Sequence, residues 1–179
     1  MSSESLKPWS YVMLALIGRG GAAPHDLVDM VRRGGRLFYA AAPSQIYAEP
    51  KRLEALGYVT SQRGPGRTHE RTVYSLTERG EDALREWLAR PAPFPRIQNE
   101  ANIRLLAGDL IDDATIVRSF AAMRDELDEL EALIAEGEAI AADVPHRERY
   151  LRLSHSLARK LLAAHREWIV EIEAELADD

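Results

Sequence analysis

The chain has 179 residues, of which 46% are hydrophobic and 29% charged, and this balance is typical of a globular protein rather than a disordered one. Its apolar runs, such as residues 11–17, are far shorter than the roughly 20 residues that a membrane span needs, and Gly18, Arg19 and Gly20 interrupt this run too early for a secretory signal. The sequence has no cysteine, which excludes disulfides, thiolate nucleophiles and cysteine-bound zinc. We therefore expect a cytoplasmic protein with no membrane contact.

The net charge of −6 is distributed unevenly along the chain. Residues 1–90 carry 13 basic and 10 acidic side chains, whereas residues 91–179 carry 10 basic and 19 acidic ones. Residues 32–72 alone carry eight basic and three acidic side chains. A general preference for arginine explains the choice of Arg over Lys but not this clustering. The pattern predicts an anion-facing surface in the first half of the chain.

Three prolines divide the chain into two regions. Pro91, Pro93 and Pro95 alternate with other residues, which prevents a regular helix and favours an extended spacer. We predict a first domain over residues 1–90, a linker over residues 91–99 and a helical second domain over residues 100–179.

The first region shows helical and then strand periodicity. Helices are predicted over residues 8–17, from Pro24 to the glycines at 34–35, and from Pro43 to Gly57. The period then changes to two, which predicts paired strands over residues 58–63 and 71–76. Thr77 is a good N-cap for a further helix with a buried stripe of Ala83, Leu84, Trp87 and Leu88. This order is that of a winged helix-turn-helix with a two-stranded wing.

The second region is predicted to form a short helix followed by two long ones, so the whole protein is mainly α-helical. Apolar residues of the first long helix, which Asp112 or Asp113 can cap, follow the spacing of a coiled-coil seam: Ile116, Phe120, Met123, Leu127, Leu130 and Ile134. The last helix carries a similar stripe, formed by Tyr150, Leu157, Leu161, Trp168, Ile172 and Leu176. These helices can pack only on each other, or they can also supply a subunit interface. We expect the second arrangement, because helix-turn-helix proteins usually read two half-sites as two-fold dimers.

Several blocks of the first region resemble the PadR family of bacterial transcriptional regulators. The blocks occur in the family's order at residues 38–39 (FY), 44–47 (SQIY), 51–54 (KRLE), 56–59 (LGYV) and 74–80 (YSLTERG). The resemblance covers roughly residues 9–90, and the helical second region suggests the longer type with an additional C-terminal domain. It implies a regulator that is more often a repressor than an activator. Pro50 departs from the pattern, since the family more often has Leu there, and it predicts a kink or a shifted register in the recognition helix.

The outward face of the helix that begins at Pro43 is suited to DNA. An α-helix enters a major groove of about 12 Å width, where Gln45 can pair with adenine while hydroxyl and amino groups donate to phosphates. Arginines of the hairpin would follow the neighbouring backbone or enter the minor groove. A solvated hairpin tip is the alternative. The predicted contacts to double-stranded DNA are Ser44, Gln45, Tyr47, Lys51, Arg52, Arg63, Arg67 and Arg71.

The sequence supports no enzyme, metal site or cofactor. Its five histidines include no pair four residues apart and no His-Glu-x-x-His pattern. Aromatic residues either belong to the core or line a pocket for a small apolar or aromatic effector; the candidates are Trp9, Phe38, Tyr39 and Trp168. We therefore predict a homodimeric, sequence-specific repressor that binds a two-fold operator. The alternative is a dimeric adaptor that retains the fold without binding DNA.

Overall fold

The computed structural model describes residues 6–39, 41–64 and 71–177. These form two compact units, Met1–Pro93 and Phe94–Asp179.

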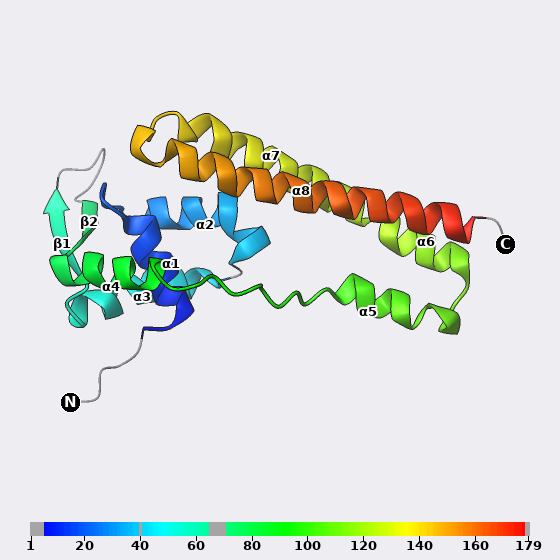
Figure 1. Cartoon of the computed structure of the whole chain (residues 1–179), viewed down its shortest axis with the longest axis horizontal. Helices are drawn as coiled ribbons and strands as arrows, with labels where there is room; N and C mark the ends of the chain where they lie inside the picture. Colours follow the sequence, from blue (N-terminus) through cyan, green and yellow to red (C-terminus); the bar gives the residue numbers. More distant parts are fainter. Residues whose placement is uncertain (1–5, 40, 65–70, 178–179) are drawn as a thin grey trace. The chain divides into compact units, whose positions relative to one another are not determined.

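The first unit is a winged helix-turn-helix (Figure 1). It consists, in chain order, of α1 (Pro8–Ile17), α2 (Pro24–Phe38), α3 (Pro43–Ala55), β1 (Val59–Gly64), β2 (Arg71–Leu76) and α4 (Glu78–Leu88). The predicted fold class is therefore confirmed. Its core draws a few side chains from each of these elements, among them Met13, Leu14, Ile17, Leu27, Ile46, Leu53 and Val59.

The wing is an antiparallel hairpin in which Val59 pairs with Leu76 and Gly64 with Arg71. Ala22 forms an isolated β-bridge with Tyr74, so the turn before α2 is joined to β2. Glycine is needed at Gly80, because a Cβ there would lie 2.0 Å from the backbone oxygen of Tyr58. This close approach seats the start of α4 against the start of the wing.

The second helix is longer than predicted. The expected stop at Gly34 and Gly35 is wrong, because α2 continues to Phe38. Glycine inside a helix costs only about 1 kcal/mol relative to alanine and leaves the backbone hydrogen bonds available. Leu37 and Phe38 follow and are half-buried, so packing beyond the glycines outweighs this cost.

The fourth helix confirms its predicted cap and corrects its predicted stripe. The Thr77 hydroxyl accepts a hydrogen bond from the Gly80 backbone N–H at 3.1 Å. Ala83 and Leu84 pack against the core, and Trp87 stacks on Tyr11 with ring centroids 5.0 Å apart. Trp87 is nevertheless 37% exposed and Leu88 64% exposed, so the predicted burial of these two residues is wrong.

In the described residues of the second unit, all regular secondary structure is helical. It comprises α5 (Glu100–Leu106), the short 3-10 helix η1 (Gly108–Leu110), α6 (Asp113–Ala121), α7 (Met123–Ala141) and α8 (Pro145–Leu176). The predicted cap is confirmed, since Asp112 accepts from the Thr115 backbone N–H at 2.8 Å. The single helix expected over the seam is instead divided at Ala122 into α6 and α7.

Helices α7 and α8 run side by side as a hairpin (Figure 1). Arginines of α8 pair across the seam with acidic residues of α7: Arg159 contacts Glu131 and Glu138, and Arg166 contacts Asp128 and Glu131. Among the described residues, no helix combines the length and apolar character that crossing a bilayer requires.

Candidate nucleic-acid interface

The face of α3 opposite the core is exposed and polar. Ile46, Pro50 and Leu53 are buried, whereas Ser44, Tyr47 and Lys51 are exposed. This is the division that the helical spacing predicts. Pro50 does not end the helix, which continues to Ala55 while the proline ring packs in the core.

Gln45 lies at the start of α3 and has a second role there. Its side-chain oxygen accepts a hydrogen bond from the backbone N–H of Ala42 at 3.3 Å, which caps the helix. A bidentate pair with adenine uses both the amide oxygen and the amide nitrogen. The same oxygen has a second lone pair, so a bond to adenine either adds to this long capping bond or replaces it.

Arg52 is directed toward α1 rather than outward. Its guanidinium bonds both carboxylate oxygens of Glu49, at 2.9 and 3.1 Å, and the hydroxyl of Ser10 at 2.9 Å. Ser10 is fully buried. The expected phosphate contact from Arg52 does not fit this arrangement, because three hydrogen bonds hold its guanidinium against Glu49 and Ser10, and we leave it out of the proposed interface.

Two of the three wing arginines that were predicted to contact DNA lie within the described residues. Arg63 is exposed near the end of β1, and Arg67 lies outside the described residues. Arg71 forms an ion pair with Asp26 of α2, which also accepts from the backbone N–H of Ala23 at 2.9 Å. Asp26 was not predicted as part of this surface, because its proximity to Arg71 depends on how α2 packs beside the wing.

The residues predicted for dimerisation fall into two groups in the second unit. One group is buried within a single chain: Ile116, Phe120, Leu127, Ile134 and Ile172 are between 2% and 6% exposed. Met123, Leu130 and Leu176 are half-buried beside them. A second chain cannot contact side chains that this unit has already enclosed, so a subunit contact through the buried group does not fit the structure.

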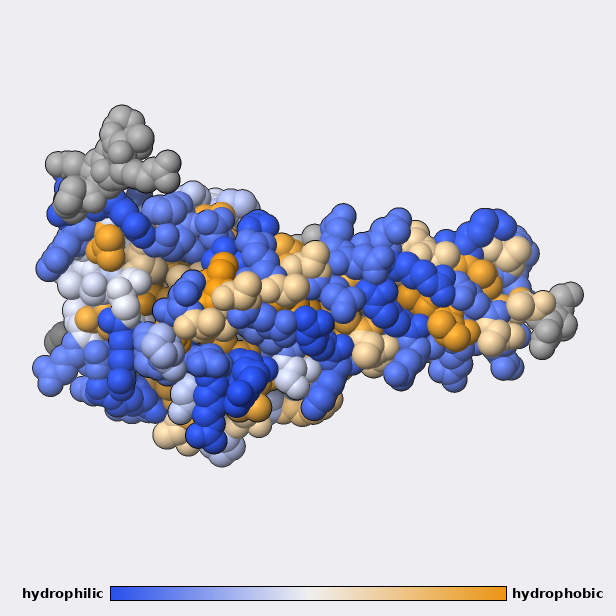
Figure 2. Space-filling model, turned by 90° about the horizontal axis from the view of Figure 1, so that it is seen from above, coloured by the Kyte–Doolittle hydropathy of each residue, from blue (hydrophilic) through white to orange (hydrophobic). Residues whose placement is uncertain are grey.

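The other group lies on a second face of α8. Leu157 and Leu161 recur at helical spacing with two residues that were not assigned to the interface, Leu153 and Ala164. Trp168 continues this spacing but is half-buried against the cluster that contains Phe120. Tyr150, Leu153 and Leu157 are 68%, 61% and 52% exposed. Figure 2 shows such apolar patches among hydrophilic side chains along the second unit. An exposed apolar stripe of this kind marks an interaction surface.

Helix α5 also exposes apolar side chains. Ala101 and Leu105 pack toward the cluster formed by α6 and α8, whereas Ile103 and Leu106 are 63% and 75% exposed. Leu110 and Ile111 continue this exposed surface beyond the helix. The spacing of Ile103, Leu106 and Leu110 was readable in the sequence and was missed, because the helix is short and follows a proline-rich linker.

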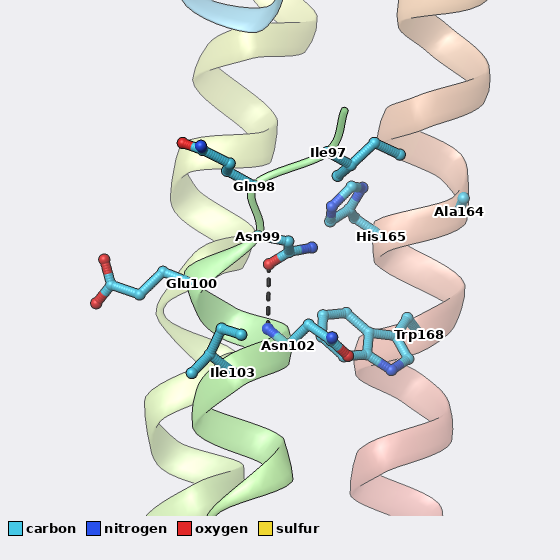
Figure 3. Close-up of a pocket in the computed structure, with 9 residues that line it drawn as sticks. All are labelled: Ile97, Gln98, Asn99, Glu100, Asn102, Ile103, Ala164, His165 and Trp168. Atoms are coloured by element: carbon cyan, nitrogen blue, oxygen red, sulfur yellow. Dashed lines mark hydrogen bonds between the residues drawn. The ribbon is translucent and has the colours of Figure 1, made fainter. Parts of the chain in front are cut away.

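The four aromatic residues proposed for an effector pocket divide between the units: Trp9, Phe38 and Tyr39 belong to the first, and Trp168 to the second. Trp168 packs edge-on against Phe120, at 5.2 Å between ring centroids. With His165 and Ala164 it forms one wall of an open pocket of about 930 Å³, and residues 97–100, 102 and 103 form the other. Figure 3 shows the rings of His165 and Trp168 directed toward Asn99 and Asn102, while Gln98 and Glu100 extend away from α8.

Comparison with known proteins agrees with this geometry. The sequence model of the "Transcriptional regulator PadR-like family" matches residues 13–86, which span α1 to α4. The negative transcriptional regulator PadR of Bacillus subtilis (strain 168) is 29% identical over 161 residues, which cover 84% of this chain and 88% of that protein. Residues 13–86 of this chain form a PadR-like transcriptional regulator domain. The match to a family of transcriptional regulators agrees with the expectation that this chain is not an enzyme.

Solved structures share the fold over nearly the full length of this PadR-like regulator. The crystal structure of B. subtilis PadR in complex with operator DNA superposes with a TM-score of 0.73 at 21% identity, covering 97% of this chain and 98% of that chain. The virulence activator AphA of Vibrio cholerae gives a TM-score of 0.64 at 26% identity, covering 94% and 96% of the two chains. B. subtilis PadR in complex with p-coumaric acid gives 0.60 at 20% identity, covering 93% and 99%. The similarity therefore includes the second unit.

Proposed function

We propose that this chain is a cytoplasmic, sequence-specific DNA-binding repressor that acts on a two-fold operator as a homodimer. The observation that carries the proposal is the outward face of α3, where Ser44, Tyr47 and Lys51 are exposed opposite a buried apolar face. B. subtilis PadR, which shares this fold, is a negative regulator and has been solved on operator DNA.

The proposed docking places α3 in the major groove, where its first turn presents Gln45 to base edges. Tyr47 and Lys51 would donate to phosphates and so set the register on the duplex. Arg63 and Arg71 of the wing would contact the backbone beside the groove. In this arrangement Asp26 competes with a phosphate for Arg71.

The proposed dimer uses the second face of α8 together with the exposed side of α5. Leu153 and Leu157 together with Ile103 and Leu106 offer apolar surface that the chain does not cover with its own described residues. Burial of such surface stabilises a dimer by about 25 cal/mol for each Å² and is the main source of affinity between subunits. A second copy is the partner that a two-fold operator requires, because each half-site is then read by one α3.

The proposed effector is a small aromatic or apolar molecule in the pocket beside Trp168. B. subtilis PadR has been solved with p-coumaric acid, and the pocket here offers an indole face, an imidazole and amide groups within one unit. Aromatic surface with a few polar groups is the usual composition of a small-molecule site. Titration with p-coumaric acid should change the Trp fluorescence of the wild type but not of a Trp168→Leu variant.

The direction of regulation requires its own test, because one relative is a negative regulator and another is called a virulence activator. A transcriptional fusion of the target promoter should become more active when the protein is deleted. Lower activity after deletion would identify an activator and overturn this part of the proposal.

DNA binding is tested with the full-length protein and the intergenic DNA beside its own coding region. If Lys51, Arg63 and Arg71 of both subunits neutralise six phosphates, affinity should fall about 10³-fold between 50 and 200 mM salt. If Asp26 retains Arg71 in the complex, four contacts predict a fall of about 10²-fold. Affinity that is nearly independent of salt would overturn the electrostatic basis of the interface.

A charge reversal separates the regulator from the adaptor. Arg63→Glu should abolish most DNA binding, whereas Arg118→Glu, at an exposed position of α6 in the acidic second unit, should leave it within about twofold. The adaptor instead predicts full activity toward its partner with either variant and no DNA binding by the wild type.

A further inference from the structure

Three polar side chains form a closed hydrogen-bond cluster between α1 and α3. The Ser10 hydroxyl donates to one carboxylate oxygen of Glu49 at 2.6 Å and accepts from the Arg52 guanidinium at 2.9 Å. Arg52 also donates to both oxygens of Glu49, at 2.9 and 3.1 Å. Each member therefore contacts the other two, although Ser10 is 39 residues before Glu49 in the chain.

The cluster is largely removed from solvent. Ser10 is completely buried, and the side chains of Glu49 and Arg52 are 14% and 33% exposed. Burial by itself raises the pKa of the Glu49 carboxyl, but the hydrogen bonds from Arg52 and Ser10 outweigh burial and lower the pKa overall. The carboxylate thus stays ionised, and the cluster stays intact, throughout the neutral range.

The cluster lies where the backbone of α3 is weakest. Pro50 follows Glu49 directly and has no N–H to donate to the carbonyl oxygen of Ile46, so one hydrogen bond of the helix is absent at this turn. The helix nevertheless continues from Pro43 to Ala55. Hydrogen bonds from α1 to the turn containing Glu49 and Arg52 hold the helix in place at this point.

The same cluster sets the rotation of α3 about its own axis. At about 100° per residue, Glu49 lies nearly opposite Tyr47 and Lys51, which face outward. A rotation of about 20° would move a side-chain tip, at a radius of 5–6 Å, by about 2 Å. That displacement is enough to break a hydrogen bond to a base edge, whereas a flexible lysine can still follow a phosphate.

We propose that Ser10, Glu49 and Arg52 are positioning residues for base recognition: by fastening the proline-containing α3 to α1, they fix the orientation in which α3 meets the bases. This inference rests on the proposed DNA-binding function. We therefore expect the cluster to affect the preference for the operator over other DNA, because the affinity for unrelated DNA comes from phosphate contacts. A single buried polar network that contributes conformational specificity has precedent in other proteins.

The test compares operator affinity with affinity for an unrelated duplex of equal length, at constant salt, for full-length variants. Ser10→Ala removes only a hydroxyl, and Glu49→Gln keeps the shape of the side chain while weakening its bonds. Both should reduce the ratio of operator to unrelated affinity by about tenfold or more, with the unrelated affinity within about twofold of wild type. Arg52→Lys, which keeps the positive charge and a single donor nitrogen, should recover part of the ratio that Arg52→Ala loses.

The matched control is Glu81→Gln, which removes an exposed ion pair with Arg85 on α4 and should leave the ratio unchanged. An equal loss of both affinities in the cluster variants would indicate a merely structural role and would overturn the proposal, as would an unchanged ratio. A wild-type protein without operator preference would instead overturn the proposed function, and the inference with it.

The link to the proline has a separate readout. Pro50→Ala restores the backbone N–H. Ser10→Ala should therefore reduce the ratio of operator to unrelated affinity by a smaller factor in a Pro50→Ala background than in the wild type. Equal losses in both backgrounds would show that the cluster acts independently of Pro50.

Discussion

The two units differ in how completely they bury their own apolar side chains. In the first unit Met13, Leu14, Ile17, Leu27 and Leu53 are at most 1% exposed, and all six of its helices and strands surround them. In the second unit the α7–α8 seam is well buried, but Ile103, Leu106, Leu110, Leu153 and Leu157 are all more than half exposed. A unit that closes its own core is expected to be stable alone, whereas one that leaves such surface uncovered is expected to associate.

The charges differ in the same way. The first region is net basic and presents Lys51 and Arg63 at its surface, whereas the second is strongly acidic and pairs several of its arginines across α7 and α8. Basic surface attracts a nucleic-acid backbone, and acidic surface is repelled by it. We therefore assign DNA contact to the first unit and association to the second.

Truncation after Arg90 should have the largest effect, because it removes the whole unit to which we assign association. The shortened chain should keep the melting behaviour of the first unit, because its core is closed without the second. It should be monomeric and lose operator affinity by 10²- to 10⁴-fold, because the two half-sites are no longer linked in one molecule. Light scattering and a binding titration measure both effects; a tight dimer of residues 1–90 would place the interface in the first unit.

Two leucine substitutions distinguish the buried seam of the second unit from the exposed face of α8. Leu127→Asp places a charge in the enclosed seam and should destabilise the unit by about 4 kcal/mol or more. Leu157→Asp lies on the exposed face of α8 and should weaken the dimer while leaving the helical content intact. Circular dichroism melting and sedimentation separate these outcomes. Loss of the dimer without loss of structure in Leu127→Asp would contradict the burial of that side chain.

A third pair of variants separates base reading from positioning on α3. Gln45→Ala should reduce discrimination at one base pair of each half-site by about 1–3 kcal/mol. Lys51→Ala should weaken operator and unrelated DNA by similar factors, because a phosphate contact carries no sequence information. Binding to a set of single-base operator variants provides the measurement. An unchanged profile for Gln45→Ala would assign base recognition to other residues.

The smallest expected effect concerns pH and the first unit. The pKa of Glu49 is lowered in the folded state, despite burial, by the hydrogen bonds from Arg52 and Ser10. Its contribution to stability is therefore fully present above the pKa of the unfolded chain and is lost as pH falls through the lower folded value. Ionisation of Glu49 should hardly change the melting temperature of the chain truncated after Arg90 between pH 6 and 8. The melting temperature should fall in acid. Glu49→Gln should flatten part of that acid decline, and an unchanged decline would exclude this group as a cause.

Local patterns made most of the first unit predictable. Pro8, Thr77 and Gly57 mark helix boundaries through backbone conformation and capping, which depend on a few neighbouring residues. The outward face of α3 follows from helical spacing alone. The end of α2 was mispredicted because two glycines are a weak local signal that packing beyond them overrides.

The sequence by itself determined the two-part organisation, the order of helices and strands, the capped starts of α4 and α6, and the heptad that forms the α7 side of the seam. Each depends on a short-range pattern of turn residues, capping groups or hydrophobic period. Only the tertiary structure decided which partner each surface side chain meets. It turned Arg52 toward Ser10 and Glu49, joined Arg71 to Asp26, and enclosed Leu127 within one chain while leaving Leu157 exposed. These contacts join residues far apart in sequence, so the packing of whole elements, rather than any local spacing, determines them.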